Sequence, residues 1–107
     1  MSPTQRSLAL MRSRGYLVAV VEKWNSFVKR RQDLFGFIDL LAIKGDELIG
    51  VQSTSGSNVS ARINKIMAEP NAVVWLSPSR KIVVHGWRKV GPRGKRKKWE
   101  CREEEVT

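Results

Sequence analysis

The chain has 107 residues, the size of one small domain, and 41% of them are hydrophobic, which is enough for a single core. Lys and Arg number 20 against 10 acids, so the formal net charge is +10. This excess predicts a polyanionic partner: nucleic acid is the main expectation, and an anionic membrane surface is the alternative. One cysteine and one histidine exclude a disulfide framework and the common zinc sites.

Neither a membrane span nor a signal peptide is apparent in the sequence. The longest apolar run, residues 17–21, is far too short to cross a bilayer. The N-terminal residues lack the pattern of a signal peptide. We therefore expect a cytoplasmic protein with no membrane partner, residing in the cytoplasm of a host cell if a virus encodes it.

The first half of the chain predicts one helix followed by three strands. Ser2, Pro3 and Gln5 form a helix start, and Gly15 is a natural helix stop. Valine and aromatic residues predict a first strand over residues 16–24. Two further strands, over 35–44 and 47–55, are expected to form a hairpin around a two-residue turn at 45–46.

The second half predicts a helix and two or three more strands. Ser57 or Asn58 can cap the helix, and Pro70 is expected to end it. Its buried stripe is expected to comprise Val59, Ile63, Ile66 and Met67. Strands are expected over 72–76 and 81–90, with a last short strand within 97–102 and an acidic tail over 103–107. The predicted class is a single α/β domain.

Asp39 is the most informative residue, because a carboxylate in an apolar strand needs a compensating partner. If Gly45 and Asp46 are the two turn residues, Asp39 lies opposite Gln52 in the predicted hairpin. Thr54 then shares the face of Gln52. Gly50, which lacks a side chain, is expected to leave room nearby for a ligand or another backbone.

Two interpretations of this pair remain open. Carboxylate and amide oxygens are hard ligands that suit magnesium, manganese or calcium. Alternatively, Asp39 and Gln52 form a buried hydrogen-bonded pair that fixes the strand register.

The sequences FIDLLAI, residues 37–43, and GVQST, residues 50–54, resemble the second and third core strands of the PD-(D/E)XK nuclease superfamily, which includes Holliday junction resolvases. The resemblance covers about residues 3–87. It implies a restriction-endonuclease-like core: a helix, a three-stranded antiparallel meander, a second helix and further strands. A basic C-terminal hairpin over about 81–102 and the acidic tail would follow this core within one domain, residues 1–107.

The resemblance also assigns roles to individual residues. Asp39 takes the place of the metal-binding aspartate, and the backbone carbonyl of Ser53 would face the metal. Gln52 takes the place of the second acid, which keeps an oxygen ligand but removes a charge. Thr54 takes the place of the lysine and cannot act as a cation. Related nucleases tolerate glutamine at the second position, and some recruit the lysine from elsewhere.

The chain contains residues that could replace the missing groups. Glu22 and Asp33 are candidate additional acids near the proposed centre. Lys23, Arg62 and Lys65 are candidate cations. For each of them a solvated surface position is the alternative.

Basic segments are expected to contact a nucleic-acid backbone, without reading base sequence. Trp87 and Trp99 flank the second segment and could stack on bases, with packing inside the protein as the alternative. The predicted contacts, besides Arg62 and Lys65, are Lys29, Arg30, Arg31, Arg88, Lys89, Arg93, Lys95, Arg96, Lys97 and Lys98.

These expectations converge on an endonuclease that hydrolyses DNA phosphodiester bonds with Mg²⁺ or Mn²⁺. Branched or junction DNA is the substrate that the resemblance suggests. A catalytically inactive nuclease-fold binding module is the main alternative, and an RNA-binding protein is a third. A resolvase works as a two-fold dimer, and Trp24, Phe27 and Trp75 could serve either a homodimer contact or the core. His85 is expected to be a surface or packing residue.

Overall fold

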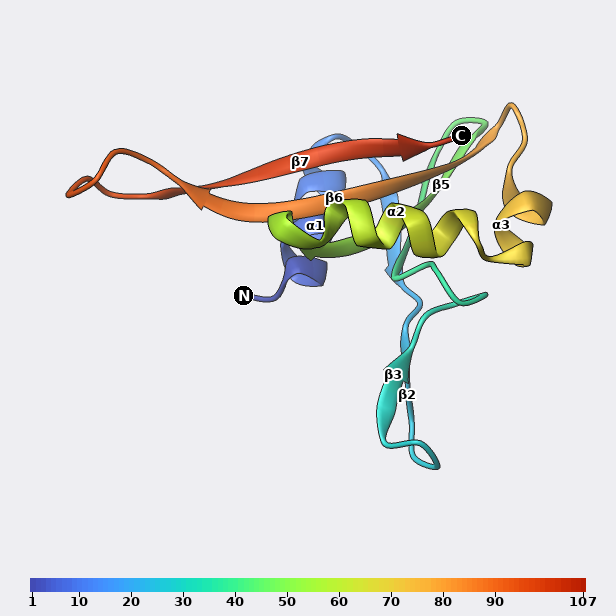
Figure 1. The fold of residues 1–107 in the computed structure, drawn as a ribbon. Helices are drawn as coiled ribbons and strands as arrows, with labels where there is room; N and C mark the ends of the chain where they lie inside the picture. The colour runs from blue at the N-terminus through green and yellow to red at the C-terminus, as the bar shows by residue number, and fades with distance from the viewer.

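The structure is a computed structural model that describes all residues from 1 to 107 (Figure 1). It is an α/β fold built on a five-stranded mixed sheet in the order β1-β4-β5-β6-β7. The strands of this sheet are β1 (Leu17–Val20), β4 (Leu40–Lys44), β5 (Glu47–Ser55), β6 (Arg80–Val90) and β7 (Lys98–Val106). The helices are α1 (Pro3–Ser13), α2 (Val59–Met67) and α3 (Pro70–Trp75), with the short 3₁₀ helix η1 (Gly56–Asn58) before α2.

Strands β1, β4 and β5 form an antiparallel meander, which agrees with the predicted order of elements. Strand β6 then pairs with β5 in parallel, and β7 returns antiparallel to β6. A parallel neighbour requires a crossover connection, and η1, α2 and α3 supply it between β5 and β6.

The sheet is covered on both faces, and each face has its own apolar cluster. Helix α1 brings Leu8 and Met11 onto Leu40 and Val51. On the opposite face, residues of α2 and α3 pack with Phe37, Ile38 and residues of β6. The alternation of side chains along β5 therefore directs one set to α1 and the next set to α2 and α3.

The expected first strand is divided in the structure. Strand β1 ends at Val20, and the chain then leaves the main sheet to form a second, two-stranded sheet of β2 (Lys23–Asn25) and β3 (Arg30–Gln32). This β2–β3 ribbon, residues 23–32, projects away from the body (Figure 1). The expectation of one continuous strand over 16–24 was wrong.

The segment expected to begin the second strand is a turn. Phe35 and Gly36 both have positive φ, at 55° and 88°, and an isolated bridge joins Leu34 to Ile38. Backbone of this kind does not continue a strand, so β4 begins only at Leu40. Asp39 lies immediately before β4, yet Lys44 pairs with Glu47 as expected from the two-residue turn.

Three expectations about the second half were also wrong. Residues 72–75 belong to helix α3 rather than a strand, with Leu76 as its C-cap, and Pro70 begins that helix at a position where proline is favoured. Met67 is 66% exposed, so it is not part of the buried stripe of α2. The acidic residues Glu103–Glu105 are not a tail, because β7 continues through them to Val106.

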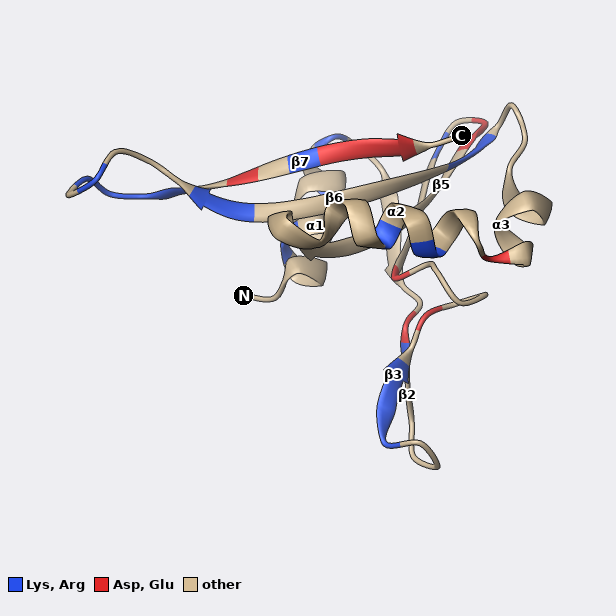
Figure 2. Ribbon diagram, in the orientation of Figure 1, with Lys and Arg blue, Asp and Glu red and all other residues tan.

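The far end of β6 and β7 extends beyond the body as a second ribbon (Figure 1). Figure 2 shows that basic residues occupy this end, while the acidic residues of β7 lie nearer the body. The molecule therefore carries two basic ribbons that point in different directions. No helix is both long and apolar enough to cross a membrane.

Candidate functional site

Three acidic side chains converge where the β2–β3 ribbon joins the body. Glu22 precedes β2, Asp33 follows β3, and Asp39 precedes β4. One carboxylate oxygen from each lies within 4.8 Å of the other two. The structure thus brings together the predicted aspartate and the two predicted additional acids. We call these three residues the carboxylate cluster.

Asp39 is buried and held by two donors from β5. Its Oδ2 accepts a hydrogen bond from Gln52 Nε2 at 2.9 Å and from the backbone N–H of Ser53 at 2.8 Å. Asp39 and Gln52 are each only 3% exposed. The predicted contact between them is therefore present, in the form of the hydrogen-bonded pair. Because Gln52 donates through its nitrogen, its amide oxygen stays free to accept or to ligate.

Burial and neighbouring acids act together on Asp39. Desolvation is the largest cause that raises the pKa of Asp39, to about 9, followed by a hydrogen bond with Asp33. The N–H of Ser53 opposes this shift, while the charges of Asp33 and Glu22 add to it. Without a cation, the Asp39 carboxyl is therefore protonated at neutral pH.

The cluster opens into a cavity of about 670 Å³, and no hydrophobic residue lines it. Arg62 and Lys65 reach it from α2, where a spacing of three residues places both on one helix face. Arg30 and Arg31 reach it from β3, and Arg31 Nη1 lies 3.7 Å from Glu22 Oε1. Four cations thus surround the acids, an arrangement suited to a substrate that carries phosphate groups.

The donor set fits a divalent cation. The carboxylate cluster and the Gln52 amide offer hard oxygen ligands, which Mg²⁺ and Mn²⁺ prefer. A cation among three carboxylates would also oppose the burial and the neighbouring acids that together raise the pKa of Asp39. The residues that would hold it are Glu22, Asp33, Asp39 and Gln52.

Two expected features of β5 turned out differently, and a third stays a prediction. Thr54 is 5% exposed and does not line the cavity, so it does not occupy a lysine-like place beside the acids. Ser53 does line the cavity, but the group it presents to Asp39 is its N–H; a role for its carbonyl stays a prediction. Gly50 leaves no room for a ligand, because Ile38 and Trp75 fill the space beside it.

Two lining residues were missed from the sequence. Glu69 contributes a fourth carboxylate to the cavity, where its side chain packs against Gly36 and accepts a hydrogen bond from the N–H of Asn71. The available signal was an acid directly before Pro70, which is a helix N-cap pattern. Thr4, on α1, also lines the cavity, and no sequence pattern singled it out.

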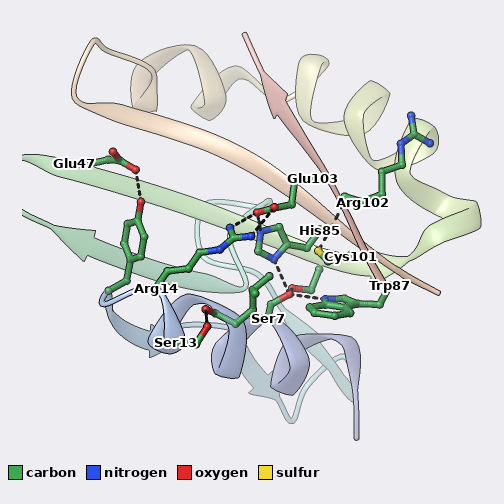
Figure 3. A network of polar contacts seen from close by, with 12 residues as sticks. Ser7, Ser13, Arg14, Glu47, His85, Trp87, Cys101, Arg102 and Glu103 are labelled. Carbon is green, nitrogen blue, oxygen red and sulfur yellow. Dashed lines mark hydrogen bonds and ion pairs between the residues drawn. The ribbon is translucent and has the colours of Figure 1, made fainter. Parts of the chain in front are cut away.

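Behind the site, a buried polar network joins α1 to the sheet (Figure 3). Ser7 Oγ accepts hydrogen bonds from Ser53 Oγ at 2.7 Å and from Trp87 Nε1 at 2.9 Å. Its own proton is then left for His85 Nδ1, also at 2.9 Å. His85 Nε2 faces Glu103 Oε1 at 3.2 Å without an aligned hydrogen bond.

This network is structural rather than catalytic. Ser7 has no exposed surface and His85 is 1% exposed, so no substrate reaches either of them despite their Ser-His-Glu order. Burial is the main cause that lowers the pKa of His85, which keeps the ring neutral. Arg14 holds Glu103 through two hydrogen bonds, which lower the pKa of that carboxyl. His85 is thus the packing residue that was expected as one alternative.

Trp87 and Trp99, for which base stacking and packing inside the protein were the two interpretations, are engaged within the protein. Trp87 donates its indole N–H to Ser7, and the guanidinium of Arg6 lies 3.7 Å from the ring centre of Trp99. Trp75 packs edge-on against Phe37 in the core. By contrast, Trp24 is 62% exposed and Phe27 is 96% exposed.

The predicted nucleic-acid contacts fall into three groups. Lys29, Arg30 and Arg31 belong to the β2–β3 ribbon, and Arg62 and Lys65 line the cavity. The third group lies along the protruding end of β6 and β7 (Figure 2) and comprises Arg88, Lys89, Arg93, Lys95, Arg96, Lys97 and Lys98. Of that group, Arg88 is paired with Glu100 at 3.3 Å.

Comparisons with protein-family models, with curated proteins and with solved structures find no match for this chain. Its function therefore has to follow from the chemistry of its own side chains. Those side chains combine clustered carboxylates, nearby cations and two basic ribbons.

Proposed function

We propose that this chain is a divalent-metal-dependent endonuclease that hydrolyses phosphodiester bonds of DNA, with Mg²⁺ or Mn²⁺ as cofactor. The observation that carries the proposal is the carboxylate cluster, whose oxygens lie within 4.8 Å of one another in a cavity lined by four cations. Acids alone would suit many cations, and cations alone would suit any polyanion. Their combination suits a metal-assisted reaction at a phosphate.

The order of elements supports placing the chain among PD-(D/E)XK-like nucleases. A helix precedes an antiparallel meander, and a second helix and further strands follow. Asp39 lies directly before the second meander strand and contacts Gln52 on the third. The departures at Gln52 and Thr54 are offset by Glu22 and Asp33, which supply negative charge beside Asp39.

Each group of residues has a defined part in the proposed reaction. Glu22, Asp33 and Asp39 would hold the cation, which when bound supplies an activated water and neutralises charge at phosphorus. Arg62 and Lys65 would bind phosphate oxygens from across the cavity and so replace the lysine that the Thr54 position lacks. Gln52 would orient Asp39 through its amide hydrogen bond.

A binding module without activity is the second candidate. The observation that favours it is the pairing of Asp39 with Gln52 and Ser53, which satisfies Asp39 Oδ2 without any cation. In that case the cavity and the ribbons would still bind a phosphate backbone. A comparison of the affinities for RNA and for DNA would then show which nucleic acid is the partner.

The test compares Asp39→Asn with the wild type on duplex, gapped and four-way-junction DNA in Mg²⁺ or Mn²⁺. Removing a ligand carboxylate is expected to reduce the cleavage rate by roughly 100-fold or more. Asp46→Asn, in the exposed β4–β5 turn, is the matched control and should cleave normally. Unchanged cleavage by Asp39→Asn would contradict the proposal. Metal-independent binding without cleavage of any DNA by the wild type would favour the binding module.

A further inference from the structure

The tip of the β2–β3 ribbon presents an aromatic ring to solvent. Phe27 is 96% exposed, and its neighbour Val28 is 49% exposed. Neither residue packs against the body, from which the ribbon projects (Figure 1). An exposed aromatic residue at the end of a projecting ribbon points to a binding partner that supplies an apolar face.

Hydrogen bonds within the turn hold this tip in shape. Asn25 Oδ1 accepts from the backbone N–H groups of Phe27, at 2.9 Å, and Val28, at 3.3 Å. Asn25 Nδ2 donates to Gln32 Oε1 at 3.0 Å, which ties the turn across the two strands. Lys29 closes the turn with a left-handed φ of 51°. Phe27 is therefore presented in advance of binding, which lowers the entropy cost of using it.

Charge identifies the class of partner. The ribbon from Lys23 to Gln32 carries four cations and no acid: Lys23, Lys29, Arg30 and Arg31. Two copies of this ribbon would repel each other, so a second copy of the chain is disfavoured as its partner. A polyanion that also offers flat apolar faces is a nucleic acid.

We propose that Phe27 stacks on an unpaired base of the DNA substrate, so that the β2–β3 ribbon selects DNA containing unpaired or branch-point nucleotides. In a continuous duplex each base is covered by its neighbours, and a single ring at a ribbon tip finds no free face. Unpaired bases offer that face. Trp99, which is 42% exposed, already has Arg6 against its ring, whereas no such contact covers Phe27.

The ribbon also sets the spacing between this contact and the carboxylate cluster, which is the part that rests on the proposed function. Phe27 lies five positions after Glu22, and the last two of these positions are in the turn beyond β2. An extended chain rises about 3.3 Å per residue, which gives a reach of at most about 16 Å. At about 3.4 Å per stacked nucleotide, the contacted base lies within roughly five nucleotides of the cleaved phosphate.

Binding is tested by fluorescence anisotropy in EDTA, with a continuous duplex and with the same duplex carrying a three-nucleotide gap. Phe27→Ala is expected to weaken binding to gapped DNA by roughly 5- to 150-fold, since stacking on one base is worth that factor, and to change duplex binding less than twofold. Phe27→Trp should keep the preference. Val73→Ala, at an apolar residue of α3 that is 75% exposed, is the matched control and should change neither.

Equal losses on both DNAs, or no loss on either, would overturn the inference. A Phe27→Ala variant that sediments as a smaller species than the wild type would also overturn it, because Phe27 would then contact a second copy.

In a separate mapping, 2-aminopurine placed along the unpaired strand should change its fluorescence through Phe27 only within about five nucleotides of the cut. The EDTA assay does not depend on cleavage, so loss of the Phe27 effect with metal-dependent cutting intact rejects this inference alone. A Phe27 effect on binding without metal-dependent cutting rejects the proposed nuclease activity alone.

Discussion

At Asp39, burial and hydrogen bonding demand opposite protonation states. Burial and the adjacent acids favour a neutral carboxyl, whereas the N–H of Ser53 favours a charged one. The raised pKa of about 9 means that burial and the adjacent acids outweigh the N–H of Ser53 in the metal-free protein. At neutral pH the folded protein therefore keeps a proton on Asp39, whereas the unfolded chain has lost it. Asp39 is thus a place where stability depends on pH with a definite sign.

In EDTA, the stabilisation linked to the Asp39 proton is fully present below the ordinary pKa of 3.8 and is lost as pH rises through about 9. Asparagine does not titrate, so Asp39→Asn does not lose this stabilisation as the pH rises. The Tm of the variant minus the Tm of the wild type should therefore increase from pH 5 to pH 9. One pH unit of linkage is about 1.4 kcal/mol, or roughly 4–8 °C in Tm for a domain of this size. Thermal unfolding by circular dichroism measures it. A constant Tm difference across this range would contradict the assignment.

Ser7 is the residue through which α1 is hydrogen-bonded to β5 and β6. Ser7→Ala leaves Ser53 and Trp87 without an acceptor and His85 without a donor. Each buried polar group left unpaired costs about 1–3 kcal/mol, so urea unfolding should show a loss of at least that size. Ser13→Ala is the control in the same helix, where the exposed hydroxyl bonds only Leu10 O, and should change stability by less than about 0.5 kcal/mol. Equal effects would show that the network adds nothing.

The contact between Asp39 and Gln52 could be predicted because it needs only a turn and a residue count. Gly45 and Asp46 set the register, and each strand residue then has a determined partner. The role given to Thr54 failed because a shared strand face does not determine which side chains reach a cavity. The place of Glu69 at the cavity could not be predicted for a similar reason, since it depends on how α3 packs.

At the scale of elements, α2 depends on a glycine in β6. A Cβ on Gly86 would lie 2.2 Å from Val59 Cγ2, and Val59 has no exposed surface. The helix approaches the sheet this closely because no side chain lies between them. That approach also brings Arg62 and Lys65 to the cavity.

Gly86→Ala should therefore destabilise the protein by roughly 1–3 kcal/mol through overpacking. Val59→Ala removes the clashing methyl group, so the double variant should be more stable than the sum of the two single effects by about 1 kcal/mol or more. Ile66→Val, two turns further along α2, is the control and should be additive with Gly86→Ala. Denaturant unfolding of the three single and two double variants measures both couplings. Additivity with Val59→Ala would contradict the proposed contact.

Elements were mispredicted where local propensity and tertiary context disagreed. The valines of residues 72–76 favour a strand by composition, but Pro70 at the first helical position and the capping side chain of Glu69 begin α3 instead. The first predicted strand, 16–24, was divided because its end leaves the sheet for the β2–β3 ribbon. The predicted α/β class is nevertheless confirmed, since the antiparallel meander and the crossover do not depend on either error.

At the scale of the whole molecule, the acids of β7 and the cations at the protruding end of β6 and β7 occupy separate regions. The acids of β7 lie near the body, where Glu103 contacts Arg14 and His85, while the protruding end of β6 and β7 is basic (Figure 2). The acidic residues expected to form a free tail are therefore part of the sheet. Because Glu103 and Glu104 are paired with Arg14 and Arg102, the net positive charge is concentrated at the two ribbons, where a phosphate backbone would bind.

If the β6–β7 ribbon contacts DNA phosphates, local charge matters more than net charge. The logarithm of the binding constant should fall linearly with the logarithm of salt concentration, with a slope of about −0.9 for each phosphate neutralised. Replacing Lys95 and Lys97 with Gln should make that slope less negative by up to about 1.8. Replacing Arg12 and Lys81 with Gln, on other surfaces, removes the same two charges and should leave the slope nearly unchanged. Salt titrations of a fixed duplex by anisotropy measure both. If the two double variants shift the slope equally, DNA responds to the total charge of the protein, and the ribbon has no direct contact with the backbone.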